Sequence, residues 1–310
     1  MTSSAGFKKA ILFTAILIVL MGILNVISLS VPVKGYFNKI ACLDGGRYGY
    51  DEVVPVLELV GEDDGTDTLI IGDSVAGQMF EGLIGKDPSV LICPTNRAVT
   101  FAGQYIFVKK YLDTHPDAKE VYIVMYTGSL ASTIDTQLSY QYVAMPFIIN
   151  GYGEDLDDVV MSKLKRNYGS PFLHPRVMNM INNSAMDRVI FLKAVSEIAE
   201  HRFGEQEPEI VSDVTVDYLN RIYELCDSHG VEVCLLSTPL CDTDVRRTEC
   251  ERIREIFEET GLAELYPDYC DSFNFMDKQY FLDDEVHFKP EYKSREFFDP
   301  IIDRMVVINR

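Results

Sequence analysis

Residues 68–80 read TLIIGDSVAGQMF, and this stretch decides the fold. The apolar run at 68–71 predicts a short buried strand, after which Gly72 permits a tight turn. Ser74 then lies at the carboxyl end of the strand and opens a helix, at the edge where open α/β sheets bind ligands. The free N–H groups of a helix start also stabilise a developing anion. Two interpretations stay open here: Ser74 is a nucleophile, or Asp73 and Ser74 only cap the helix.

The rest of the chain repeats this strand-helix pattern and predicts an α/β fold. Short apolar runs predict further strands, and longer amphipathic runs predict helices between them. A mainly parallel sheet covered on both sides, a three-layer α/β/α sandwich, follows from this alternation. An insertion is expected at 127–215, with helices at 155–166 and 185–201. The other predicted strands are 89–93, 121–126, 231–237 and a last core piece at 271–276; the other helices are 104–112, 216–229 (ended by Gly230), 244–260 and 291–307.

The amino terminus predicts one transmembrane helix. Residues 10–33 carry no charge, and a helix of this length reaches roughly 36 Å, enough to cross a bilayer core. A cleaved signal peptide normally has a shorter apolar region of about 7–15 residues. Lys8 and Lys9 put residues 1–9 in the cytoplasm, so the remainder is expected outside the cell membrane as a single-pass protein. Residues 34–66 are expected to be a juxtamembrane linker with a short helix at 52–60, and 67–310 the folded domain.

Charge and cysteine content exclude two classes of function. The chain has 28 basic and 48 acidic residues and a net charge of −20, so it would repel nucleic-acid phosphates. None of the seven cysteines has CxxC spacing, and neither a metal site nor a cofactor is expected. Cys241 and Cys250 flank a polar loop, where they can pair if the domain lies outside the cytoplasm. His115 and His229, at predicted helix ends, are expected to be exposed.

A second motif, Asp284-Glu285-Val286-His287, supplies what a serine nucleophile needs. A serine hydroxyl is weak until a base takes its proton, and histidine suits that role. A carboxylate holds the imidazole in the right tautomer. Asp284 and His287 lie three residues apart in a predicted turn, so both side chains can face one site. The alternatives are an ordinary helix-capping aspartate and a surface histidine.

These two motifs resemble those of the SGNH/GDSL hydrolase family. Gly72-Asp73-Ser74 follows the first strand and Asp284-x-x-His287 precedes the last helix, as in that family. The resemblance covers about residues 67–310 and implies a flavodoxin-like sandwich. With its predicted anchor, the layout is most similar to the membrane-anchored SGNH-like proteins that accompany O-acyltransferases, of the D-alanyl transfer and alginate acetylation types.

The resemblance implies a role for each matching residue. Ser74 would be the nucleophile, His287 the base and Asp284 its orienting carboxylate. The oxyanion hole would use Ser74 and Gly103. The family's third block usually reads Gly-x-Asn-Asp, whereas residues 126–130 read YTGSL without an asparagine. Ser129 or Thr127, or another residue of the insertion, is expected to donate instead. Otherwise the site is slow or inactive, since losing one such donor typically costs about 10²–10³ in rate.

Three functions follow as expectations. The first is an acyltransferase or acylesterase that acts on a cell-surface glycan or polymer beside a polytopic O-acyltransferase. The second is a degenerate domain that only binds a glycan or such a transferase. The third, an anchored lipase, is weaker because no lid-like apolar helix lies beside the motif.

Overall fold

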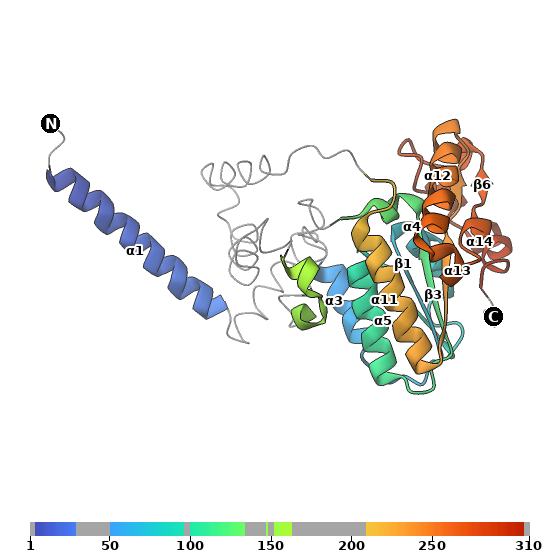
Figure 1. Ribbon diagram of the computed structural model, residues 1–310, viewed down its shortest axis with the longest axis horizontal. Helices are drawn as coiled ribbons and strands as arrows, with labels where there is room; N and C mark the ends of the chain where they lie inside the picture. The colour runs from blue at the N-terminus through green and yellow to red at the C-terminus, as the bar shows by residue number, and fades with distance from the viewer. Residues whose placement is uncertain are drawn as a thin grey trace.

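Four parallel strands form the centre of the domain (Figure 1). The computed structural model describes residues 4–28, 50–95, 100–133, 147, 152–162 and 209–306. The sheet has the order β2-β1-β3-β4. The predicted α/β class is therefore confirmed. The strands are β1 Thr68–Gly72, β2 Val90–Ile92, β3 Glu120–Met125 and β4 Glu232–Ser237.

The apolar strand β1 is buried on both faces because helices cover both sides of the sheet. One core contains Leu69 and Ile71 with α3, α5 and α11, and it extends to α12 and α13. The other contains Ile70 with α4 and α14. Side chains alternate along a strand, so successive residues of β1 and β3 enter opposite cores. The helices are α3 Tyr50–Leu59, α4 Ser74–Phe80, α5 Phe101–Thr114, α11 Asp213–His229, α12 Asp244–Thr260, α13 Leu262–Leu265 and α14 Arg295–Ile302.

Several predicted boundaries change. The short helix predicted at 52–60 is present as α3, and it packs Val53 and Leu57 into the first core, so this part of the 34–66 segment belongs to the folded unit. The helix α5 begins three residues earlier than predicted, and α14 is shorter because a 3₁₀ turn precedes it. Gly230 caps α11 with a left-handed φ of 69°, as predicted.

The last core piece at 271–276 does not join the main sheet. Its final residues form β6 Phe275–Met276, which pairs in parallel with β5 Leu240–Cys241 as a separate two-stranded sheet. A 3₁₀ turn at Cys270–Ser272 takes the first part of the segment out of extended conformation. The other 3₁₀ turns are η1 Glu81–Leu83, η2 Thr127–Ala131, η4 Tyr152–Asp155, η7 Lys278–Tyr280 and η8 Pro290–Tyr292.

The amino-terminal segment is helical, as α1 Ser4–Ser28. Within the described residues, no helix combines the length and apolar character needed to cross a membrane. The span at 10–33 therefore stays a prediction. Most of the predicted insertion, including its helix at 185–201, lies outside the described residues.

Two side-chain predictions are corrected. Cys241 and Cys250 are both buried free thiols, so the proposed pairing is not formed. His115 is buried rather than exposed, because its Nε2 atom lies 3.0 Å from Asp64 Oδ1 and its ring stacks on Tyr111. The acidic loop before β1 thus folds back over the end of α5.

Candidate active site

Ser74, His287 and Asp284 form one continuous chain of hydrogen bonds. The Oγ atom of Ser74 lies 2.8 Å from His287 Nε2, and His287 Nδ1 lies 2.7 Å from Asp284 Oδ2. The structure thereby brings together three side chains that come from the two ends of the domain. The first distance suits proton transfer from a hydroxyl to an imidazole, and the second is that of a hydrogen bond between the imidazole and the carboxylate.

A tight turn places Asp284 and His287 on the same side of their loop. The second oxygen of Asp284, Oδ1, accepts hydrogen bonds from the N–H groups of Val286 and His287, each at 2.9 Å. Glu285 adopts a left-handed φ of 58°, uncommon for a residue with a side chain, and forms an ion pair with Lys278. Burial opposes ionisation of Asp284, but the hydrogen bonds from His287 and Val286 outweigh it and lower the pKa of the carboxyl.

The sheet core anchors this loop on both sides of the turn. Phe281 and Phe288 form an antiparallel bridge, stack with ring centroids 4.8 Å apart and are fully buried beside α4 and α14. The N–H of Phe288 donates to Oε1 of Gln78 at 2.9 Å. Gln78 lies one helical turn after Ser74 on α4, so the helix that carries Ser74 also holds the loop that carries His287.

Asp73 caps α4 and orients Ser74. Its Oδ1 atom accepts the N–H groups of Val75 at 3.0 Å and Ala76 at 3.4 Å. The capping interpretation therefore holds for Asp73, while Ser74 starts the helix with its hydroxyl on His287. Among the first-turn N–H groups of α4, that of Ser74 has no hydrogen bond within the described residues.

The other oxygen of Asp73 holds the segment after β3. Oδ2 accepts the N–H of Tyr126 at 2.7 Å and the hydroxyl of Ser129 at 2.9 Å. Burial raises the pKa of this carboxyl, and the four hydrogen bonds work against that shift. One carboxylate thus joins the segment that carries Ser74 to the 3₁₀ turn after β3.

Two predicted oxyanion donors are already used in the structure. The hydroxyl of Ser129 donates to Asp73, and the N–H of Gly103 donates to Thr100 O at 2.8 Å inside the first turn of α5. Gly103 is part of that helix rather than of a loop, because α5 begins at Phe101. These two predictions are therefore corrected, and Ser74 keeps its place among the predicted donors.

Tyr126 and Arg246 lie at the rim of the site. The register pairs Gly72 with Val124, so the chain two residues further on places Tyr126 beside Ser74. The guanidinium of Arg246, on α12, lies 4.8 Å from the centre of the Tyr126 ring. Burial raises the pKa of Tyr126 to about 12, so the phenol stays protonated at neutral pH.

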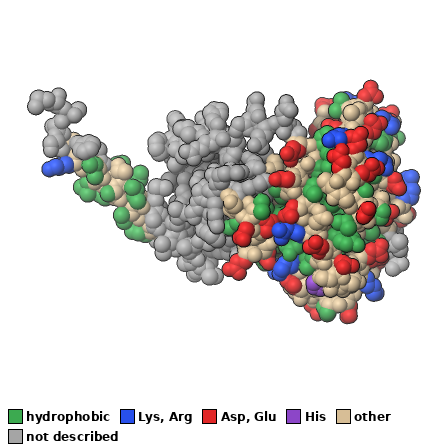
Figure 2. Space-filling view, viewed as in Figure 1, with side chains coloured by type: hydrophobic (Ala, Val, Ile, Leu, Met, Phe, Trp, Pro, Cys, Tyr) green, Lys and Arg blue, Asp and Glu red, His purple; other side chains and the backbone are tan. Residues whose placement is uncertain are grey.

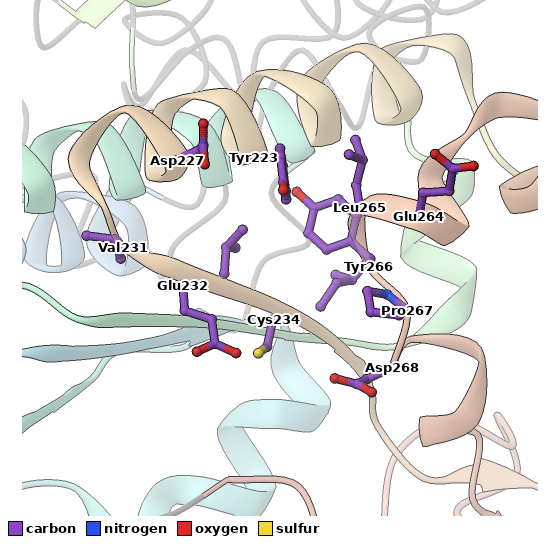
Figure 3. A pocket seen from close by; sticks show the side chains of 12 residues that line it. Tyr223, Asp227, Val231, Glu232, Cys234, Glu264, Leu265, Tyr266, Pro267 and Asp268 are labelled. Atoms are coloured by element: carbon purple, nitrogen blue, oxygen red, sulfur yellow. The ribbon is translucent and has the colours of Figure 1, made fainter.

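The two pockets that flank β4 lie away from Ser74. One, of about 350 Å³, is lined by Tyr223 and Asp227 of α11, Glu264 of α13 and Glu232 of β4 (Figure 3). The other, of about 590 Å³, lies against Tyr122 on the opposite face of the sheet. Acidic side chains are spread over the visible surface (Figure 2). In the part of the chain that the structure describes, no group of side chains is arranged to hold a metal ion.

Two residues of the site were not predicted from the sequence. The hydrogen bonds of Asp73 to the segment after β3 could not be predicted, because a helix cap already accounts for an aspartate at this position. Nothing in the sequence marks Gln78, whose partner lies 210 residues away. Comparisons with protein-family models, curated proteins and solved structures found no match.

Proposed function

We propose that this protein is a serine acyltransferase or acylesterase that works through an acyl-enzyme on Ser74. The observation that carries the proposal is the hydrogen-bond chain from Ser74 through His287 to Asp284, at 2.8 and 2.7 Å. The chain places a nucleophile, a base and the carboxylate that orients the base in one line.

The reaction follows from this order of groups. His287 Nε2 takes the proton of the Ser74 hydroxyl while Oγ attacks the acyl carbonyl carbon. The tetrahedral intermediate then collapses, and Nε2 returns the proton to the oxygen of the leaving alcohol. An acceptor hydroxyl, or water, repeats the sequence on the acyl-enzyme and frees Ser74. Transfer and hydrolysis differ only in which acceptor enters.

The substrate class and the location rest on the resemblance to the SGNH family. The Gly72-Asp73-Ser74 and Asp284-x-x-His287 motifs and the parallel sheet support an SGNH-like domain that acts on a cell-surface glycan or polymer. The apolar amino terminus supports a membrane anchor with the domain outside the cell, beside a polytopic O-acyltransferase. Membrane fractionation of intact cells with external protease tests this: protection of the domain until lysis would contradict it.

A second candidate is a domain that binds a glycan or a transferase without catalysis. The Gly103 N–H and the Ser129 hydroxyl were expected as oxyanion donors, but both donate hydrogen bonds to other protein groups. This loss of donors favours a domain that does not catalyse. Such a domain would keep the Ser74–His287 contact but lack turnover.

Turnover of a chromogenic acetyl ester separates the two candidates. Ser74→Ala should abolish it, and Ser228→Ala, which removes an exposed hydroxyl at the end of α11, should leave it unchanged. Equal turnover by Ser74→Ala and the wild type would remove Ser74 from its role. Absence of turnover in the folded wild type, together with glycan binding, would support the second candidate.

A further inference from the structure

Within the part of the chain that the structure describes, Gln104 is a buried carboxamide without a hydrogen-bond partner. It has no exposed surface, and neither its Nε2 nor its Oε1 atom has a hydrogen bond. The hydroxyls of Thr100 and Thr127 are buried and unpaired in the same way. Leaving a buried polar group unpaired is destabilising, so three such groups in one region call for an explanation.

These groups lie at the sheet edge that carries Ser74. Thr100 is the N-cap of α5 and makes no capping bond with its side chain, and Gln104 follows one turn later. Helical side chains lean toward the amino end, which directs Gln104 back to that edge. Thr127 comes two residues after β3, which ends at the same edge.

Gln104 and the base lie on opposite faces of the sheet. The α5 residues Phe101 and Val108, one turn before and after Gln104, belong to the core that contains Ile71. The His287 loop packs through Phe288 into the other core, with α4 and α14. Ser74 starts α4 at the end of the strand between these cores. At this end of β1 the His287 loop thus packs on one face of the sheet, and the first turn of α5 packs on the other.

We infer that the Gln104 carboxamide is the missing side-chain donor of the oxyanion hole. The family uses an asparagine carboxamide after the third strand, and Gln104 supplies the same group from the first turn of α5. Its Nε2–H donates a hydrogen bond to the carbonyl oxygen as negative charge develops there, and no proton is transferred. Because the amide is covered in the free chain, its side-chain torsions must turn toward Ser74 when the acyl group enters. This inference rests on the proposed function.

Substitution of Gln104 in the full chain tests the inference with two independent readouts. Gln104→Met keeps the size of the side chain and removes the donor. It should lower kcat/KM for a chromogenic acetyl ester by about 10²–10³-fold through kcat, and slow the labelling of Ser74 by a fluorophosphonate similarly. The thermal midpoint should stay the same or rise, since an unpaired buried amide is lost. Gln104→Glu, which has the same shape, should be impaired as well.

Thr238→Val is the matched control. It removes another fully buried, unpaired hydroxyl, which follows β4 rather than β3, and should leave kcat/KM unchanged. Wild-type kcat/KM in Gln104→Met, or a clear fall in its thermal midpoint, would overturn the inference, the latter by showing a structural partner for the amide. Absence of both turnover and labelling in the wild type would instead refute the proposed function, and the inference with it.

Discussion

The imidazole of His287 is useful as a base only if its Nε2 atom carries a lone pair. The 2.7 Å contact with Asp284 keeps the ring proton on Nδ1 and leaves Nε2 facing the Ser74 hydroxyl. An amide in place of the carboxylate loses the charge that stabilises the imidazolium and allows the wrong tautomer.

Asp284→Asn should therefore lower kcat by about 10³–10⁴-fold with the fold intact. Asp283→Asn is the control, because this neighbouring exposed carboxylate has no hydrogen bond to His287. Kinetics on an acetyl ester with circular dichroism of both variants checks the expectation. Equal activity in the two variants would exclude Asp284 from the site.

The pKa shifts of Asp73 and Asp284 run in opposite directions. The pKa of Asp284 lies below its ordinary value of 3.8, so its contribution to stability is present above that pH and is lost as the pH falls through the folded value. The pKa of Asp73 is raised by burial, so the folded chain binds its proton more tightly. The free energy of unfolding therefore decreases as the pH rises from 3.8, the pKa in the unfolded chain, to the higher pKa of Asp73 in the folded chain.

Asp73→Asn should destabilise the protein by about 1–3 kcal/mol, because its NH₂ group faces an N–H donor of Val75 or Tyr126. The pH dependence that Asp73 causes should disappear with it. Urea unfolding at several pH values measures both effects, with Asp113→Asn at the exposed end of α5 as control. Unchanged unfolding of Asp73→Asn would contradict the bridging role.

At the scale of elements, the junction between β1 and α4 depends on Gly72. A Cβ atom there would lie 2.0 Å from the backbone oxygen of Val124 and 2.7 Å from the Cβ of Ala76. Backbone atoms of a central strand cannot move aside, so only glycine lets β1 approach β3 this closely and lets the turn to Ser74 follow.

Gly72→Ala should destabilise the domain by roughly 1–3 kcal/mol or more, as overpacking of a core does. Gly77→Ala is the matched control inside α4, where the nearest atom to a new Cβ is Pro94 Cγ at 4.0 Å. It should stabilise by about 0.5–1 kcal/mol because alanine favours helix. Thermal unfolding of both variants measures these effects. A shift of the thermal midpoint in the same direction for Gly72→Ala and Gly77→Ala would be inconsistent with the geometry.

Helix α4 also positions the base, through the bond from Phe288 N to Gln78 Oε1. Gln78→Met should lower kcat by about tenfold and stability by about 1 kcal/mol, since a backbone donor loses its acceptor. Gln78→Glu keeps an acceptor oxygen and should restore most of kcat. Failure of the glutamate to rescue would mean that Gln78 acts by packing rather than by this hydrogen bond.

The elements could be predicted wherever the local pattern decides them. Strands β1 and β3 are apolar runs bounded by polar residues, and α12 begins and ends at the predicted residues 244 and 260. The boundary before residue 67 could not be predicted, because α3 joins the core by packing against α5 rather than by its own pattern. Likewise β6 has strand character but finds its partner only in β5.

At the scale of the whole molecule, the sheet divides the site between two cores. The nucleophile lies at the strand end, the base on the α4 and α14 side, and the buried Gln104 on the α5 side. The two motifs could be paired from the sequence, since a serine nucleophile needs a base and a carboxylate that orients it. The sequence did not reveal which donors are free, because the use of the Gly103 N–H and the Ser129 hydroxyl depends on contacts between elements.

The most direct test of the central claim is to locate the adduct of a serine-directed fluorophosphonate on the folded protein by peptide mass spectrometry. The proposed mechanism predicts one phosphonyl group on Ser74 in the wild type, none in Ser74→Ala, and slow labelling in Asp284→Asn. Labelling of a different residue, or no adduct on folded wild-type protein, would contradict a nucleophilic Ser74.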